Sequence, residues 1–227
     1  MPQIFAPRAN AITKSILVGL AVVLVLGAVL VESLTLLPYV TLEGMVPKGT
    51  WVGLTPDQPV PFSHKHHAGS LGLDCRYCHT TTEDSWFAGL PPTHTCMTCH
   101  SQFLDQAPML APLRRSLASG TPLTWSRVNN LPDYVYFDHS IHVAKGVGCE
   151  ICHGRIDKMP LTRVENPFTM ELCLDCHRDP RPYLRPTDRV FTMGWRPQGD
   201  ARALGRELLR ANRVDTAHLT DCYTCHR

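Results

Sequence analysis

The sequence has few aromatic residues and no run of charges of one sign. Aromatic side chains make up only 7% of its 227 residues, whereas 19 residues are prolines. The 22 Lys and Arg and the 20 Asp and Glu residues are scattered along the chain, which argues against a nucleic-acid partner. A chain of this length ordinarily buries one or two apolar cores. The shortage of aromatic side chains indicates that other groups fill the interior.

No cysteine is left over for a separate role, because all ten fall into five Cys-x-x-Cys pairs, each followed at once by a histidine. This is the motif that attaches haem c. Its two sulfurs bond the vinyl groups of one haem, and its histidine binds the iron. We therefore expect five haems c. The predicted attachment residues are Cys75, Cys78, Cys96, Cys99, Cys149, Cys152, Cys173, Cys176, Cys222 and Cys225. The predicted proximal iron ligands are His79, His100, His153, His177 and His226.

Cys-x-x-Cys pairs can also bind zinc or form disulfides. Zinc would not require a histidine after every pair, and five pairs cannot be divided evenly into four-cysteine sites. Haem attachment explains both the histidines and the odd number of pairs. Residues beyond about 50 leave roughly 35 residues for each of five haems, so the macrocycles would supply much of the buried apolar surface.

The first forty residues contain one long apolar segment. Residues 16–31 carry no charge, and the apolar character resumes after Glu32 and Ser33. The segment is about 20 residues long, which is enough to cross a membrane. Arg8 and Lys14 precede it, so the positive-inside rule keeps the N-terminus in the cytoplasm.

These features predict the topology of the chain. We expect residues 1–14 in the cytoplasm, residues 15–37 as a single-pass anchor in a bacterial inner membrane, and the remainder on the periplasmic, extracytoplasmic side. A cleaved signal peptide is the alternative. Such peptides have shorter apolar cores that end in a small-x-small cleavage site, and no convincing site follows here.

A pattern of one phenylalanine and two histidines occurs twice. The sequence Phe-x-His-x-x-His lies at 62–67, before the first two haem motifs, and at 137–142, before the third and fourth. The phenylalanines are 75 residues apart, and the motifs that follow them are 74 and 77 residues apart. Duplication of a two-haem unit explains this near-constant offset. The fifth motif is then an added single-haem unit.

The repeats divide the chain beyond the anchor. Residues 38–61 are rich in Pro, Gly and Thr and indicate an irregular tether. Residues 62–102 and 137–180 are the two dihaem repeats, the prolines of the connecting segment 103–136 break any long helix, and residues 181–227 carry the fifth motif. The expected fold class is a multihaem cytochrome c, in which a loop-rich, short-helix, haem-packed domain follows a single N-terminal transmembrane helix.

One segment near the C-terminus has a helical pattern. Asp200 can cap a run from 201 to 211, in which Ala203, Leu204 and Leu208 recur at helical spacing. We expect this helix to pack over the fourth or fifth haem.

A second axial ligand decides whether an iron only transfers electrons or also binds substrates. Of the 12 histidines, five complete the motifs and seven remain. The pattern Phe-x-His-x-x-His places two imidazoles about one helical turn apart, where they can serve neighbouring haems. The predicted distal ligands are His64, His67, His139, His142 and His218.

Other residues are weaker candidates for the distal position. For His66 and His94 a surface role is favoured. Methionine would raise the potential of its haem, although plain packing is the commoner role. The methionines considered are Met97, Met109, Met159, Met170 and Met193.

The two dihaem units resemble class III multihaem cytochromes. Together with one N-terminal anchor and a fifth haem motif, the longer stretches are similar to the pentahaem cytochrome c subunit of alternative complex III. The resemblance rests on PFSHKHHAGSLGLDCRYCHT, LPPTHTCMTCH, WSRVNNLPDYVYFDHSIHVAKGVGCEICHGRIDKM and MELCLDCHRDP.

The resemblance implies a place in a respiratory chain. Alternative complex III is a bacterial membrane complex that oxidises quinol in place of cytochrome bc1. Its other subunits include an iron-sulfur subunit related to molybdopterin oxidoreductases, polytopic membrane subunits and a monohaem cytochrome c. Electrons would pass along the haems of this chain to a soluble cytochrome c or a copper protein.

Three functions remain open on the sequence. The favoured one is an electron-transfer subunit that has no catalytic residues of its own. The second is a multihaem reductase with an open iron. The third is an anchored quinol dehydrogenase that feeds a periplasmic reductase, in which a quinol site would lie where the first haem meets the membrane.

Overall fold

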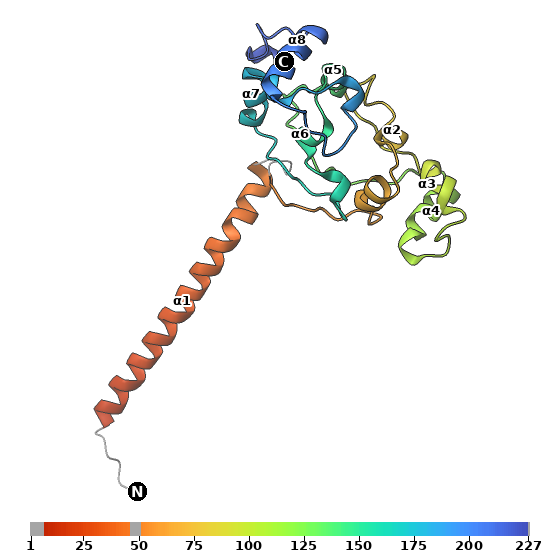
Figure 1. Ribbon diagram of the computed structural model, residues 1–227. Helices are drawn as coiled ribbons and strands as arrows, with labels where there is room; N and C mark the ends of the chain where they lie inside the picture. Colours follow the sequence, from red (N-terminus) through yellow and green to blue (C-terminus); the bar gives the residue numbers. More distant parts are fainter. Residues whose placement is uncertain (1–6, 46–50, 227) are drawn as a thin grey trace. The chain divides into compact units, whose positions relative to one another are not determined.

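The computed structural model describes residues 7–45 and 51–226, and within the N-terminal helix it describes the side chains of residues 11–34. The chain divides into two compact units, one with the N-terminal helix and one with all the haem motifs (Figure 1).

Helix α1 runs from Pro7 to Met45. Within it, Ala11–Leu34 is the one described stretch that is long and apolar enough to cross a membrane, with a mean hydropathy of 2.6 and no buried residues. At 1.5 Å per residue these 24 residues extend for about 36 Å, which exceeds a hydrocarbon core of about 30 Å. The predicted anchor therefore lies on a single continuous helix.

The helix also continues through residues 38–45, where the sequence suggests an irregular tether. Residues 1–6 of the predicted cytoplasmic segment and residues 46–50 of the tether lie outside the described residues.

The second unit is built of short helices joined by loops. In its described part the only β pairing consists of two isolated bridges, Val135 with His226 and Val147 with Leu184. Its α-helices are α2 Cys75–Cys78, α3 Thr93–His100, α4 Ala111–Ser119, α5 His139–Ala144, α6 Cys149–His153, α7 Met170–Arg178, α8 Ala201–Ala211 and α9 Cys222–Cys225. Its shorter helical turns are η2 Lys65–Ser70, η3 Pro108–Leu110, η4 Ile156–Lys158, η5 Arg181–Tyr183 and η6 Thr187–Arg189.

Every Cys-x-x-Cys motif forms a helical turn. In α2, α6 and α9 the first cysteine begins the helix, and α3 and α7 each contain a whole motif. Aspartates cap three of the short helices, because a carboxylate satisfies amide groups that the first turn leaves unpaired. Asp74 accepts from Arg76 N in α2, Asp138 accepts from Ser140 N in α5, and Asp200 accepts from Arg202 N in α8.

The predicted helix 201–211, capped by Asp200, is confirmed as α8. It packs on η5 through the buried Gly205, where a Cβ atom would collide with the Arg181 carbonyl group. Asp179 also links the two elements, because its carboxylate forms ion pairs with Arg181 of η5 and with Arg202 of α8. The glycine and the ion pairs together fix α8 beside the end of α7.

The side chains of this unit bury little apolar surface. Seven hydrophobic side chains are buried among the described residues, and three of them, Val60, Leu110 and Leu113, form one cluster. The others are Met159, Val164, Leu184 and Val190. Large apolar side chains such as Phe103 and Met170 are 71% and 66% exposed. A domain with so small a side-chain core fits an interior that is completed by large apolar groups.

Candidate haem-binding sites

Four proximal histidines face four of the predicted distal histidines. The pairs, with the distance between ring centroids and the angle between ring planes, are His64 with His79 (6.4 Å, 7°), His67 with His100 (6.1 Å, 63°), His139 with His153 (6.4 Å, 5°) and His142 with His177 (6.2 Å, 21°).

These distances match the space that one metal ion with two axial imidazoles requires. An imidazole nitrogen binds a metal at about 2 Å and lies about 1 Å from its ring centre, so two rings on opposite sides of one metal have centroids roughly 6 Å apart. Each pair is thus spaced for a single iron. The residues present therefore fit haem iron with histidine on both sides.

The hydrogen bonds of these eight histidines leave the same nitrogen free. Nδ1 of each lies against a neighbouring polar group, and where that group is a carbonyl oxygen the bond fixes the tautomer in which Nε2 is unprotonated and can bind a metal. The Nδ1 partners of the distal set are Thr162 Oγ1 for His64, Ser63 O for His67, Trp86 O for His139 and Asp138 O for His142, at 2.7 to 2.9 Å. The Nδ1 partners of the proximal set are Gly89 O for His79, Phe103 O for His100, the Asn129 amide for His153 and Leu219 O for His177, at 2.8 to 3.0 Å.

The two Phe-x-His-x-x-His patterns fold alike. Phe62 lies edge-on to His64 at 4.9 Å and stacks on His67 at 4.4 Å. In the second repeat, Phe137 lies edge-on to the first histidine at 4.8 Å and stacks on the second at 4.5 Å. Each phenylalanine holds two imidazoles at a fixed angle to one another, which aims them at two different irons.

Burial favours the neutral form of three of these imidazoles. Burial, together with a smaller effect of neighbouring histidines, lowers the pKa of His64 and of His153 to about 4. Burial also lowers the pKa of His142. A neutral imidazole is the form that binds a metal.

Several motif cysteines lie in buried surroundings. Burial raises the pKa of Cys152 to about 12 and the pKa values of Cys149 and Cys176 to about 11. All ten cysteines are free of disulfides, and the described residues contain no cluster of three or more metal-binding side chains.

The fifth motif has a different environment. His226 donates from Nδ1 to the Tyr134 carbonyl group at 3.3 Å, and the two rings stack at 5.8 Å. His218 has a 70% exposed side chain whose Nδ1 atom lies 2.8 Å from an Asp221 oxygen. The described residues include no ring contact between His218 and His226. The structure thus sets four of the five predicted distal histidines opposite a motif histidine, and among the described residues His218 has no such ring partner.

The weaker candidates lie in various places. His66 and His94 are exposed, and the ring of His66 lies edge-on to that of His67. Met159 is buried in the protein interior, whereas Met109 is 58% exposed.

Contacts between the motifs place them in a definite order. His64 and His67, one turn apart, join the first and second motifs, and His139 and His142 join the third and fourth in the same way. The loop that follows His79 reaches the third motif, because Trp86 O accepts from His139.

The fourth and fifth motifs are joined through the segment that precedes α9. His177 donates to Leu219 O, and the fifth motif in turn pairs with the strand-like segment before the second repeat, where Tyr136 N donates to Cys225 O at 2.8 Å. These contacts link the motifs in the order second, first, third, fourth, fifth.

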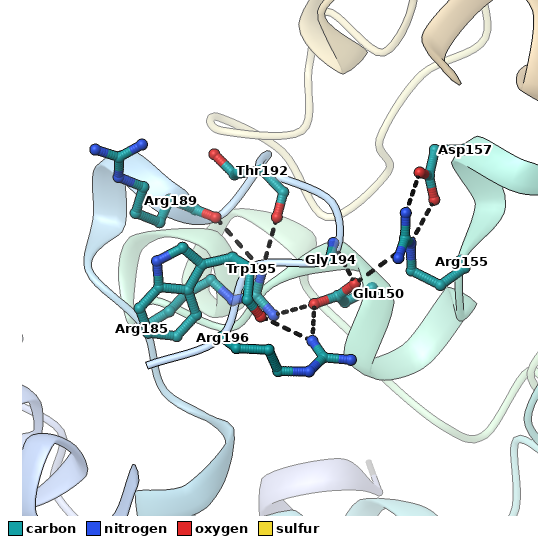
Figure 2. Close-up of polar contacts among 9 residues, drawn as sticks. All are labelled: Glu150, Arg155, Asp157, Arg185, Arg189, Thr192, Gly194, Trp195 and Arg196. Atoms are coloured by element: carbon teal, nitrogen blue, oxygen red, sulfur yellow. Dashed lines mark hydrogen bonds and ion pairs between the residues drawn. The ribbon is translucent and has the colours of Figure 1, made fainter. Parts of the chain in front are cut away.

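A buried ion-pair cluster fixes the third motif (Figure 2). Glu150, which lies between the two cysteines of α6, is only 5% exposed and accepts from Arg185 at 2.8 Å, Arg196 at 2.9 Å and Gly194 N at 2.7 Å. Burial alone would raise the pKa of Glu150, but the hydrogen bonds from Arg185 and Gly194 outweigh it and lower the pKa. Arg155 lies on the other side of the carboxylate at 3.9 Å. The cluster ties α6 to the segment 185–196.

Sequence patterns gave no sign of several residues that now belong to the sites. Asn129 and Thr162 hydrogen-bond to predicted ligands that lie in distant parts of the chain. Glu150 occupies one of the two positions that the Cys-x-x-Cys motif leaves unspecified. Their roles depend on the path of the loops around the motifs, which no local spacing encodes.

Comparisons with known proteins identify multihaem cytochrome c families in this chain. Residues 135–227 match the family described as cytochrome c7 and related cytochrome c, and residues 45–111 match the class III cytochrome c family. The chain is 36% identical over 124 residues to the multiheme cytochrome c subunit of a menaquinone reductase from Nitratidesulfovibrio vulgaris. The alignment covers 54% of this chain and 52% of the relative, so the chain spans about half the length of the curated relative that it matches.

Proposed function

We propose that this chain, which consists of multihaem cytochrome c domains behind one apolar helix, is the five-haem electron-transfer subunit of a membrane complex that exchanges electrons with quinone. The proposed ligands are the five Cys-x-x-Cys-His motifs and, on the distal side, His64, His67, His139 and His142. When bound, haem c accepts and releases single electrons. The chain's own residues hold each iron, occupy the distal position of the irons in the first four motifs and set the spacing between neighbours.

The observation that carries this proposal is the set of four facing histidine pairs, with ring centroids 6.1 to 6.4 Å apart. An iron that has histidine on both sides has no position for a substrate. At four of the five motifs the geometry therefore favours electron transfer over a reductase, which requires an open iron.

The arrangement of the motifs supports a continuous path. Neighbouring motifs share a helical turn or a loop at each step, from the second motif at one end to the fifth at the other. Direct contacts of this kind, such as the 2.7 Å bond from His139 to Trp86 O, bring successive sites close without an intervening domain. Electrons would enter at one end motif and leave at the other.

The direction and the partners form the finer part of the proposal. In alternative complex III, quinol is the donor, and the partners are an iron-sulfur subunit, polytopic membrane subunits, a monohaem cytochrome c and a soluble cytochrome c or copper protein. In this assignment α1 (Pro7–Met45) anchors the chain, and the haem domain lies on the periplasmic side of the inner membrane. The resemblance of the motif order supports this assignment.

A second candidate reverses the direction of electron flow. The relative with 36% identity is a subunit of a menaquinone reductase, a complex named for delivering electrons to the quinone. The residues that hold the haems would serve electron flow from quinol and electron flow to quinone equally. An iron with two axial histidines can accept an electron from a neighbour on either side. The direction is set by the partners and by the potentials.

Purification from native membranes in mild detergent tests the proposal. We expect the chain to copurify with polytopic subunits and an iron-sulfur subunit, and the haems of the first four motifs to be low-spin. Quinol-dependent reduction of the intact complex, or menaquinone reduction by it, then decides the direction. Recovery of the chain alone, or with a periplasmic reductase, would contradict the complex and support the anchored quinol dehydrogenase.

A further inference from the structure

The proximal histidines differ in what accepts their Nδ1 proton. For four of them the partner is a backbone carbonyl group: Gly89 O for His79, Phe103 O for His100, Leu219 O for His177 and Tyr134 O for His226. The fifth, His153, faces the side-chain amide of Asn129 at 3.0 Å. Only the third motif thus depends on a side chain at this position.

The orientation of this amide follows from the chemistry of the ligand. Nδ2 of Asn129 is placed toward His153 Nδ1, and Oδ1 of Asn129 is buried without a hydrogen-bond partner. If Nε2 of His153 binds iron, Nδ1 carries a proton and requires an acceptor. An amide turned by 180° exchanges its oxygen and nitrogen with almost no change in shape. The turned amide directs Oδ1 at His153, and its NH2 group takes the former place of Oδ1, where a haem propionate is the kind of acceptor it requires.

We propose that Asn129 is the positioning residue of the third haem, and that the bond from His153 Nδ1 to Asn129 Oδ1 sets the reduction potential of that haem. A hydrogen bond to the second ring nitrogen orients the ligand and raises its basicity, which tunes the metal. The inference rests on the proposed ligation of iron by His153. It goes beyond that ligation, because it assigns control of one potential to a residue outside every haem motif.

The position of the third motif gives this residue its importance. In the order second, first, third, fourth, fifth, the third motif joins the half of the domain from the first repeat to the half from the second. A change in potential at this point alters the step that every electron must take. Asn129 comes from the connecting segment, so it can vary without disturbing either repeat.

Two substitutions with opposite effects test the proposal. In Asn129→Asp a carboxylate replaces the amide oxygen, strengthens the hydrogen bond and favours the ferric state, so one midpoint potential should fall. In Asn129→Leu the acceptor is lost, and the same potential should rise. The matched control is Asn130→Asp, which introduces the same charge one residue away, where the side chain accepts from Arg127 rather than from a histidine.

The measurement is a spectroelectrochemical titration of the full-length haem-loaded protein, with the low-spin signals followed by electron paramagnetic resonance. We expect one potential to shift downward in Asn129→Asp and upward in Asn129→Leu, with the others unchanged and all signals retained. Equal shifts in Asn129→Asp and Asn130→Asp would show a general charge effect and overturn the proposal, as would unchanged potentials. If Asn129→Leu does not incorporate haem, the isosteric Asn129→Asp and its control decide alone.

A separate variant distinguishes failure of this inference from failure of the ligand assignment. In His153→Ala one low-spin signal should be lost. If the signal persists, His153 is not an iron ligand and the proposed site fails. If it is lost while the Asn129 variants behave as wild type, the ligation stands and the role of Asn129 is refuted.

Discussion

The rings of His139 and His153 lie face to face, with centroids 6.4 Å apart and planes within 5°. The two residues come from different helices, α5 and α6, and each has its Nδ1 atom occupied by a group from elsewhere in the chain. Each ring of the pair is thus oriented by a hydrogen bond from outside its own motif. Ligands oriented in this way keep their positions in both oxidation states of the metal, which suits electron transfer.

Removal of a distal histidine should open one iron. In His139→Ala the third haem loses its second axial ligand, so we expect one low-spin haem to become high-spin, and the protein to gain the ability to bind carbon monoxide at that site. Absorption and electron paramagnetic resonance spectra measure the change. The control is His94→Ala, which alters an exposed histidine and should leave the spin state of every haem as it is in the wild-type protein. A wholly low-spin His139→Ala protein would contradict the pairing.

For His218, the sequence spacing and the structure lead to different predictions. Its position before the fifth motif predicts a distal ligand, but its side chain is 70% exposed and its Nδ1 atom lies 2.8 Å from an Asp221 oxygen. From this geometry, His218→Ala should leave the spin state of every haem unchanged. Spectra of the variant and of the wild-type protein decide the point. Conversion of one haem to high spin would show that His218 moves onto the fifth iron when the haem is attached.

Loss of the buried carboxylate should destabilise the domain strongly. In Glu150→Gln the carboxylate that Arg185 faces becomes neutral, and the guanidinium group, only 3% exposed, remains as an unpaired charge. Breaking a buried pair from one side costs about 3–5 kcal/mol. Thermal unfolding of the haem-loaded protein measures the loss. The control Glu165→Gln changes an exposed pair with Arg163, which should cost at most about 1 kcal/mol.

The same carboxylate predicts how stability depends on pH. The pKa of Glu150 is lower in the folded protein than its ordinary value. Its contribution is therefore present above the pKa of the unfolded chain and is lost as the pH falls through the folded value. Acid unfolding of wild-type protein should show this loss, and the Glu150→Gln variant should lack that part of the dependence. Identical acid profiles would contradict the ion pair.

Much of the site could be read from short-range patterns. The cysteine pairs and their histidines follow from fixed spacing, and the helical turn between His64 and His67 places both rings beside one phenylalanine. The helix 201–211 follows from its cap and its apolar spacing, both of which are local. Where two interacting residues are only a few positions apart, the sequence pattern is sufficient to predict that they interact.

Long-range partners could not be predicted in this way. Trp86 O is 53 residues from its hydrogen-bond partner His139, and Asn129 is 24 residues from His153. Glu150 and Arg185, which form the buried ion pair, are 35 residues apart in the sequence. Such contacts depend on the path that the loops take around the haem-binding motifs. Short sequence patterns carry no information about that path. The same limit explains why the described part of the structure shows no iron-ligand partner for His218. A position close to Cys222 in the sequence does not place its ring opposite His226.

The intact mass of the chain isolated from native membranes tests the central claim most directly. The account predicts one species whose mass exceeds that of the polypeptide by five covalently attached haems, retained under denaturing conditions. A chain that carries fewer haems, or none, would contradict the assignment of every Cys-x-x-Cys-His motif to a haem, and with it the continuous path from the second motif to the fifth.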